Sequence, residues 1–418
     1  MRALVYDVKP AGWAACWALR KVWRGCQLTP LNGLSLREMN VPDLPTGQWV
    51  RVSTRLAGIC GTDCAILAQK QVPDSILQAF SSMPFVLGHE NVSVVEAVGA
   101  EVAGEWVGRR VCVDPGLSCP VRGIDPPCGA CAAGHFGACE NFGADGQGES
   151  RLPPGTSVGY NRATGGAFAE SFVAHVSQLV PVPDSLSDEQ AVLTDPLACS
   201  LHAVLRSDRL ASARRVLVYG AGMLGLGVIT SLRAMDYGGE IHVIVRRPSQ
   251  AKMAMAMGAS RCLQLPADRR GRYQAIAEAT GASIHRVRFD NCTLTGGYDV
   301  VFECVTSAAS LTESLRWTRS RGEVIYLGTG RAAGADLTAL WFQELDVRGA
   351  YGRQIERLGS RQIATYPLVH ELMAGGRLKT EGLLTHTFEL GDYRRALATA
   401  MHMRGPGAIR VAFDFRKQ

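Results

Sequence analysis

Three short motifs carry side chains that can bind zinc. Cys60 lies in GICGTD, His89 in GHE, and Asp195 in TDPLA. A thiolate, a neutral imidazole and a carboxylate are all ligands that zinc accepts in proteins. A histidine taken alone is more often a satisfied polar residue, so Cys60 and His89 do not decide the matter by themselves. Together with the carboxylate, they predict a metal site.

Four cysteines form a second candidate metal group. Cys119, Cys128, Cys131 and Cys139 fall within 21 positions, whereas most of the 13 cysteines lie singly in apolar surroundings. In a reducing compartment, clustered cysteines indicate a metal before a disulfide. Reduced surface cysteines without a metal are the alternative. The scattered cysteines are expected to be small buried hydrophobic residues.

A glycine-rich turn at 220–225, GAGMLG, is typical of dinucleotide binding. It follows the strand-like RVLVYG, opens a helix-like stretch, and precedes a second strand-like run, IHVIV. The glycines permit a tight turn, a close approach of the backbone to a pyrophosphate, and close packing of helix on strand. The alternative is a glycine turn in an α/β domain without cofactor. The predicted cofactor contacts are Gly220, Gly222, Met223, Leu224 and Gly225.

The residues after IHVIV indicate which dinucleotide binds. NAD-binding domains usually carry an acidic residue there to hold the ribose 2′-hydroxyl. This chain instead has Arg246 and Arg247, whose guanidinium groups can clamp a 2′-phosphate. NADP is therefore favoured over NAD, and the alternative is that both arginines are solvent-facing loop residues.

Composition excludes several classes of protein. Of the 418 residues, 47% are hydrophobic and 20% charged, and the mean hydropathy is +0.04, as in ordinary globular proteins. The net charge of +6 is scattered, so nucleic acid is not an expected partner. No apolar run reaches the roughly 18 residues of a membrane span. In 11–37 the charges follow the apolar run, unlike in a signal peptide, which predicts a cytoplasmic chain.

The order of strand-like and helix-like segments predicts two domains. The first 195 residues read mainly as β-branched strands and loops, whereas strands and helices alternate from about residue 197. Such alternation is typical of a parallel sheet with helices on both faces. We therefore predict an α/β fold: a β-rich domain formed by 1–197 and 350–418, into which 198–349 insert a doubly wound Rossmann sheet.

Together these motifs resemble the zinc-dependent medium-chain alcohol dehydrogenases, especially the polyol, sugar and threonine dehydrogenase branches. The resemblance covers GICGTD, GHE, the cysteine cluster, DPLA, the glycine turn and the late GAIRVAFDF. It implies that the β-rich domain is GroES-like and that the chain forms a homodimer or homotetramer.

The resemblance also implies roles for single residues. Cys60, His89 and Asp195 fall at the catalytic zinc ligands, although the branch usually has Glu where Asp195 stands. Glu90 resembles a carboxylate that can enter the coordination shell. Asp63 matches the residue that orients the ligating histidine, and Thr62 the hydroxyl that takes the substrate proton. The cysteine cluster matches a lobe that binds a second, structural zinc, with either Cys119 or Asp125 as its first ligand; Cys119 is favoured because four thiolates suit a closed site.

The predicted activity is hydride transfer between NAD(P) and an alcohol, namely a secondary alcohol, polyol or sugar-like substrate, giving the ketone or aldehyde. Zinc as a Lewis acid favours the alkoxide, from which hydride passes to the nicotinamide. Two alternatives remain: a zinc-free enoyl or quinone reductase of the same fold, and a non-catalytic NADP-binding sensor.

Overall fold

The computed structural model describes residues 1–70, 75–143, 145–289, 291–330, 332–403 and 407–416. Its chain divides into two compact units. Unit 1 contains Met1–Asp195, Arg353–His370 and Thr380–Gln418, and unit 2 contains Pro196–Gly352 and Glu371–Lys379.

Unit 1 is built on β-sheets. One sheet of seven strands has the order β19-β20-β3-β5-β6-β8, and β7 also pairs with β3. These strands are β3 (Trp49–Gly58), β5 (Glu90–Val98), β6 (Arg110–Val113), β7 (Ser171–His175), β8 (Leu179–Pro181), β19 (Leu384–Phe388) and β20 (Arg410–Asp414). A smaller sheet joins β2 (Leu34–Glu38), β1 (Arg2–Tyr6) and β4 (Phe85–Val86), and β17 (Ile355–Leu358) and β18 (Arg361–Ala364) form a hairpin.

The core of unit 1 lies where strands from both ends of the chain meet. Phe168 and Phe413 are fully buried with their rings 4.8 Å apart, and Trp49 and Leu56 of β3 belong to the same unit's buried interior. Burying such large side chains provides most of the driving force for folding. Because β20 pairs with β3, this core fixes the end of β3, from which the GICGTD motif continues.

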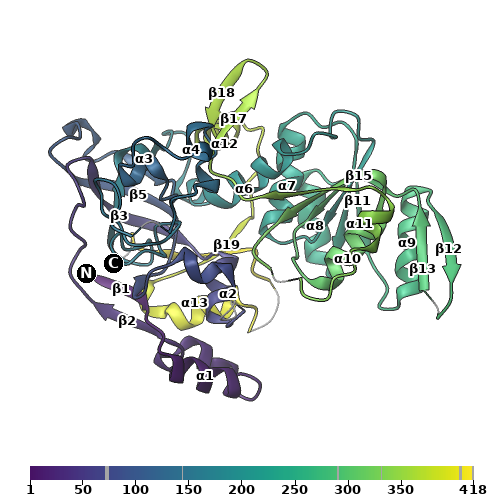
Figure 1. Ribbon diagram of the computed structural model, residues 1–418, viewed down its shortest axis with the longest axis horizontal. Helices are drawn as coiled ribbons and strands as arrows, with labels where there is room; N and C mark the ends of the chain where they lie inside the picture. Colours follow the sequence, from purple (N-terminus) through teal and green to yellow (C-terminus); the bar gives the residue numbers. More distant parts are fainter. Residues whose placement is uncertain (71–74, 144, 290, 331, 404–406, 417–418) are drawn as a thin grey trace. The chain divides into compact units, whose positions relative to one another are not determined.

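Short helices surround the sheets of unit 1 (Figure 1). They are α1 (Pro10–Leu19), α2 (Gly61–Leu67), α3 (Cys119–Arg122), α4 (Gly129–Ala132), α5 (Asp188–Ala191) and α13 (Tyr393–Ala400). The 3-10 helices are η1 (Arg24–Leu28), η2 (Pro30–Asn32), η3 (Ile76–Phe80), η4 (Gly104–Trp106), η5 (Phe136–Ala138), η6 (Val176–Gln178) and η7 (Leu390–Asp392). Two helices, α6 (Thr194–Leu205) and α12 (Thr365–Ala374), contain residues of both units.

Unit 2 is a parallel six-stranded sheet with the order β11-β10-β9-β14-β15-β16. This is the doubly wound arrangement, with the first strand at the centre and a crossover to the fourth. The strands are β9 (Arg215–Tyr219), β10 (Glu240–Val245), β11 (Arg261–Gln264), β14 (Tyr298–Glu303), β15 (Thr318–Leu327) and β16 (Asp346–Ala350). The connecting helices are α7 (Met223–Ala234), α8 (Pro248–Met257), α9 (Arg269–Thr280), α10 (Ala308–Trp317) and α11 (Thr338–Phe342).

The predicted fold class is confirmed, since the strand and helix runs of the second half form an α/β unit and the remaining strands a β-rich one. One element was not predicted: the antiparallel hairpin of β12 (Ser283–Val287) and β13 (Asn291–Thr295), which packs beside α9 (Figure 1). Among the residues described, no helix has the length and apolar character needed to cross a membrane.

Candidate metal centres and dinucleotide site

The turn between β3 and α2 positions Cys60. This residue is the N-cap of α2, and the carboxylate of Asp63 accepts a hydrogen bond from its backbone N–H at 2.9 Å. The second oxygen of Asp63 accepts a hydrogen bond from the Tyr160 hydroxyl at 3.0 Å. Asp63 is fully buried. This capping arrangement fixes the direction in which the Cys60 thiol leaves the helix.

Cys60, His89 and Glu90 form a three-residue group that could hold a metal ion. One potential ligand atom from each lies within 4.8 Å of the others. His89 and Glu90 stand at the start of β5, and Glu90 lies opposite Gly58 in the β3–β5 pairing. A Cβ at Gly58 would meet the Glu90 carboxylate at 2.3 Å, so only glycine leaves room for this carboxylate.

The imidazole Nδ1 of His89 and the carboxylate of Glu90 are buried without ordinary hydrogen-bond partners among the described residues. Within the described part of the chain, Nδ1 of His89 and both carboxylate oxygens of Glu90 make no hydrogen bond. Arg410 forms an ion pair with Glu90, in which the Nη2 atom of Arg410 lies 2.9 Å from Oε1 of Glu90. Burial raises the pKa of Glu90 well above its usual range, although the Arg410 charge opposes this effect. Buried polar atoms left in this state are costly unless another group satisfies them, and a cation would do so.

Asp195 lies outside this group of ligand atoms. Its Oδ1 is 3.2 Å from the Nη2 of Arg353 and also accepts a hydrogen bond from the Tyr366 hydroxyl at 2.5 Å. Burial alone would raise the pKa of Asp195, but the charges of Arg353 and His89 and the Tyr366 bond outweigh burial and lower it. Asp195 is therefore an ionised, already partnered carboxylate close to the group.

Thr62 and Asp63 lie near the same ligand atoms. The Sγ of Cys60 is 3.6 Å from the Thr62 hydroxyl oxygen. Asp63 Oδ1 is 3.9 Å from Nδ1 of His89, which is too long for a hydrogen bond but close enough for a charge interaction. The structure thus gathers six predicted residues in one region of unit 1, and Arg353, Tyr366 and Arg410 join them without having been predicted.

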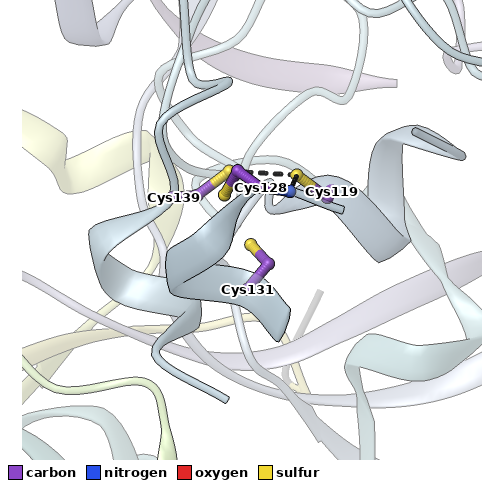
Figure 2. A group of neighbouring side chains, drawn as sticks. All are labelled: Cys119, Cys128, Cys131 and Cys139. Atoms are coloured by element: carbon purple, nitrogen blue, oxygen red, sulfur yellow. Dashed lines mark hydrogen bonds between the residues drawn. The ribbon is translucent and has the colours of Figure 1, made fainter. Parts of the chain in front are cut away.

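The four clustered cysteines form the second group that could hold a metal ion (Figure 2). These cysteines come from α3, from α4 and the residue before it, and from the residue after η5. Their four sulfurs all lie within 4.8 Å of one another. The Cys119 and Cys139 sulfurs are 3.7 Å apart. Tetrahedral zinc with Zn–S bonds of about 2.3 Å separates its sulfurs by about 3.8 Å. Cys119 belongs to this group, whereas the group does not include Asp125.

Backbone and amide N–H groups surround the clustered sulfurs. Cys119 accepts hydrogen bonds from the Cys128 backbone at 3.4 Å and from the Asn141 amide at 3.2 Å. Cys128 accepts from the Glu140 backbone and Cys139 from the Asn141 backbone. Such donors stabilise thiolates, and although burial opposes this, they lower the pKa of Cys128 to about 7.

Arg122 organises the loops around the cysteine group, and sequence reasoning missed it. Its guanidinium is fully buried and donates to five backbone carbonyls, those of Leu117, Phe142, Leu152, Pro153 and Gly155. Sequence offers a weak signal, because a single arginine three residues after a cysteine looks like any surface arginine. Its role depends on loops up to 33 residues away.

The glycine turn of unit 2 has the geometry that its motif predicts. Gly220 has φ of +112°, which favours glycine, and a Cβ at Gly225 would lie 1.8 Å from the carbonyl oxygen of Gly220. A Cβ at Gly222 would meet no atom within 4 Å, so this position faces open space. Gly222 is also the N-cap of α7, and no side chain caps the helix there. Met223 and Leu224 form the first turn of α7.

Arg246 and Arg247 stand between β10 and α8. The backbone N–H of Arg246 donates to the Gln250 side chain at 2.9 Å, and Gln250 in turn donates to the Ala221 carbonyl of the glycine turn at 3.4 Å. Arg246 is exposed and Arg247 half-buried. Arg246 is thereby tied to the glycine turn, and Arg247 is the N-cap of α8.

Comparison with known proteins reveals relatives along nearly the whole chain. Two family models match: the alcohol dehydrogenase GroES-like domain over residues 46–184 and the zinc-binding dehydrogenase over residues 224–372. A sorbitol dehydrogenase of Arabidopsis thaliana is 26% identical over 388 residues, which are 93% of this chain and 94% of the relative. An L-threonine 3-dehydrogenase of Paraburkholderia phytofirmans is 28% identical over 377 residues, 88% of this chain and 93% of the relative.

A solved structure has the same fold. An alcohol dehydrogenase of Escherichia coli CFT073, complexed with the cofactor NADH, superposes with a TM-score of 0.73 at 21% identity, covering 99% of both chains. The matched domains and relatives define a class: the chain belongs to the zinc-dependent medium-chain alcohol dehydrogenases. It is an NAD(P)-dependent oxidoreductase that acts on an alcohol, as predicted, and neither the zinc-free reductase nor the sensor is favoured.

Proposed function

We propose that Cys60, His89 and Glu90 hold the catalytic zinc of this dehydrogenase. The observation that carries the proposal is the grouping of their ligand atoms within 4.8 Å, with the imidazole Nδ1 and both carboxylate oxygens lacking hydrogen bonds in the described residues. Zinc bound there supplies Lewis acidity that lowers the pKa of an alcohol hydroxyl. Asp195 stays with Arg353 and Tyr366 and acts on the group through its charge.

Thr62 is the residue that we propose takes the proton from the substrate hydroxyl. Its own hydroxyl lies 3.6 Å from the Cys60 sulfur, beside the atoms that would hold the metal. Asp63 is a positioning residue, because it holds the Cys60 turn through the backbone and places a carboxylate 3.9 Å from His89. We therefore expect Thr62 variants to alter kcat and Asp63 variants to alter metal affinity as well.

The substrate that we propose is a secondary alcohol, a polyol or a sugar-like alcohol. The relatives named above act on sorbitol and on L-threonine, both of which carry a secondary hydroxyl. A panel of sorbitol, L-threonine, 2,3-butanediol and ethanol, assayed at equal concentrations, tests this. A kcat/KM for ethanol above that for all three secondary alcohols would contradict the proposed substrate class.

The preferred cofactor that we propose is NADP. No acidic residue follows β10, and Arg246 and Arg247 place two cations at that edge of the sheet, where a 2′-phosphate carries negative charge. Replacing both with alanine should weaken NADPH binding by about tenfold to a hundredfold, at roughly 1–3 kcal/mol for charge-assisted bonds. NADH binding, measured by the same calorimetry, serves as the control and should change little. An equal loss for both cofactors would contradict the assignment.

A second, structural zinc is proposed for Cys119, Cys128, Cys131 and Cys139. Four sulfurs with N–H donors around them suit a closed tetrahedral site, and the 3.7 Å separation of two sulfurs agrees with its geometry. Such a site requires reduced thiols, which supports the proposal that the enzyme works in the cytoplasm. Elemental analysis of enzyme purified without chelator should give two zinc ions per chain. A zinc content of one ion per chain in the wild type, unchanged when Cys60 is replaced, would leave the catalytic centre unsupported.

The oligomer that we propose is a homodimer or homotetramer. The strand β16 is an edge of the parallel sheet, and Trp341 and Phe342 of α11, the helix that precedes β16 in the chain, are 79% and 75% exposed. An open sheet edge and large exposed aromatic groups both favour association. Sedimentation of the wild type and of the Trp341→Glu variant tests this, with a shift toward the monomer expected for the variant.

A further inference from the structure

The segment between β1 and β2 contains two buried cysteines with no role in either metal group. Cys16 lies in α1 and Cys26 in η1, and both are fully buried. Their sulfurs are 3.1 Å apart. A disulfide bond measures about 2.05 Å, so only a small movement separates this pair from a covalent link.

This pair is unlike the four-cysteine group. It has only two sulfurs, and in the residues described it is not part of any group of three or more candidate metal ligands. The Cys26 thiol also donates a hydrogen bond to the Cys16 carbonyl, at 3.6 Å. The 3.1 Å approach of the two sulfurs places the pair for disulfide formation rather than for metal binding. Burial raises the pKa of Cys16 to about 12, so loss of its proton is the slow part of any such reaction.

The loop between the two cysteines reaches the helix that carries the proposed catalytic residues. Arg20 stacks on Trp17, 3.3 Å from the ring centre, and donates to the carbonyl of Ala68 at 3.3 Å. Ala68 is the C-cap of α2, whose N-cap is Cys60. A link between residues 16 and 26 would therefore restrict a loop that caps this helix.

Two further hydrogen bonds join the same segment to the end of α2. Asn32, fully buried, donates to the carbonyl of Leu67 at 2.9 Å, and the side chain of Gln69 donates to the Trp13 carbonyl at 2.8 Å. The last carbonyls of a helix have no partner within the helix, so the Asn32 donor, like Arg20, stabilises its end, and the Gln69 bond ties the residue after the helix to the segment. The segment thus acts as an external cap of α2.

We propose that Cys16 and Cys26 are a redox-active dithiol pair, which hydrogen peroxide converts into a disulfide that fixes the Arg20 cap on α2. One sulfur, after losing its proton, attacks peroxide and breaks the O–O bond, which gives a sulfenic acid and water. The second sulfur then displaces the sulfenic oxygen as water, and the S–S bond forms. In total, two thiols and one peroxide give one disulfide and two waters. A thiol reductant reverses the change.

Peptide mapping tests the covalent part directly on the full-length enzyme. Purified protein is treated with peroxide, unfolded in denaturant that contains an alkylating agent to block free thiols, and digested with trypsin. Cleavage after arginine and lysine puts Cys16 in the peptide 3–20 and Cys26 in the peptide 25–37. We expect a linked pair of these peptides that lacks two hydrogen atoms, and loss of both alkylation signals. Cys292, a buried cysteine of the β12–β13 hairpin, reports general oxidation and should remain alkylated.

Hydrogen exchange tests the effect on α2. The amides of Ala68, Gln69 and Lys70 should exchange more slowly in the oxidised enzyme than in the reduced enzyme. In the Arg20→Ala variant the disulfide should still form, but this difference should disappear. Recovery of Cys16 and Cys26 as separate alkylated or sulfinic peptides would overturn the proposal. A linked pair without slower exchange at 68–70 would overturn the part that concerns α2.

Discussion

The two candidate metal groups of unit 1 differ in how the protein satisfies their ligand atoms. Around the four cysteines, backbone N–H groups already donate to three of the sulfurs. In the group of Cys60, His89 and Glu90, the imidazole Nδ1 and both carboxylate oxygens lack hydrogen bonds in the described part of the chain. The first group is stabilised from outside, as a structural site requires. In the second group, His89 Nδ1 has no hydrogen bond among the described residues and Glu90 is held by an ion pair with Arg410 that can exchange, as expected where coordination changes during a reaction.

The surroundings of the two groups differ in charge as well. Beside the Cys60 group lie a buried cation, Arg410, and a buried carboxylate, Asp195, each with its own partner. Beside the cysteine cluster, the buried cation Arg122 is satisfied by five carbonyls. Charges that can exchange partners suit a group whose protonation and ligands change, whereas a charge fixed by backbone suits a rigid lobe.

The largest effect is expected from Cys60→Ala. Loss of a thiolate ligand should abolish the Lewis-acid contribution, which at roughly 4 kcal/mol corresponds to about a thousandfold decrease in kcat/KM. Steady-state assays and elemental analysis measure this together. The zinc content should fall from two to one while thermal unfolding stays within a few degrees. Loss of both zinc ions would mean that the two groups are not independent.

The matched test of the other group compares Cys119→Ser with Asp125→Asn. Removing a thiolate from the cluster should release the structural zinc and lower the free energy of unfolding by about 3 kcal/mol. The Asp125 variant should retain both zinc ions and nearly wild-type stability, because this residue is not in the cluster. Chemical denaturation with a zinc-sensitive dye follows both quantities. The reverse order of effects would assign the first ligand to Asp125.

A third comparison separates Glu90 from Asp195. Glu90→Gln should lower kcat/KM by about a hundredfold and weaken zinc binding, since it removes a proposed ligand. Asp195→Asn should cost about tenfold or less, because it removes only a nearby charge and the acceptor used by Arg353 and Tyr366. Zinc affinity in a chelator competition assay distinguishes the two. If Asp195→Asn releases the metal more readily than Glu90→Gln, the shorter carboxylate is the ligand.

How far the sequence predicts these sites depends on the separation along the chain of the residues that contact one another. The glycine turn and its flanking strands are local, so the φ of Gly220 and the close packing at Gly225 follow from the motif. Cys60, His89 and the cysteine cluster are likewise short motifs. The partners of Asp195 lie 158 and 171 residues further along the chain, and Arg410 donates to a carbonyl 351 residues earlier. No spacing pattern encodes such tertiary contacts.

Elements whose burial is low were also hard to predict. The strand β12 is exposed along most of its length, so it lacks the alternation of buried and exposed residues that marks a strand. Its pairing with β13 is seen only in the structure. The cysteine pair of the segment 11–37 and its bonds to α2 likewise depend on residues that carry no motif.

The smallest expected effect concerns the start of α5, whose residues belong to neither metal group. Burial alone would raise the pKa of Asp188, but hydrogen bonds and charges from Arg55 and Arg110 outweigh burial and lower it. Asp188 therefore stabilises the fold above its unfolded pKa of about 4, and this contribution is lost as the pH falls through the lower folded pKa.

Asp188→Asn should accordingly destabilise the enzyme by about 1 kcal/mol at pH 7, a modest value because both arginines are partly exposed. Below about pH 4 the difference between variant and wild type should shrink, because the wild-type carboxylate becomes protonated. Denaturant titrations from pH 7 to pH 3 measure it, with Asp184→Asn as a control at a nearby acidic residue. A difference that is constant over this range would mean that Asp188 acts through packing and not through its charge. Zinc content should be unchanged in both variants, because the charge interactions of Asp188 do not involve either metal group.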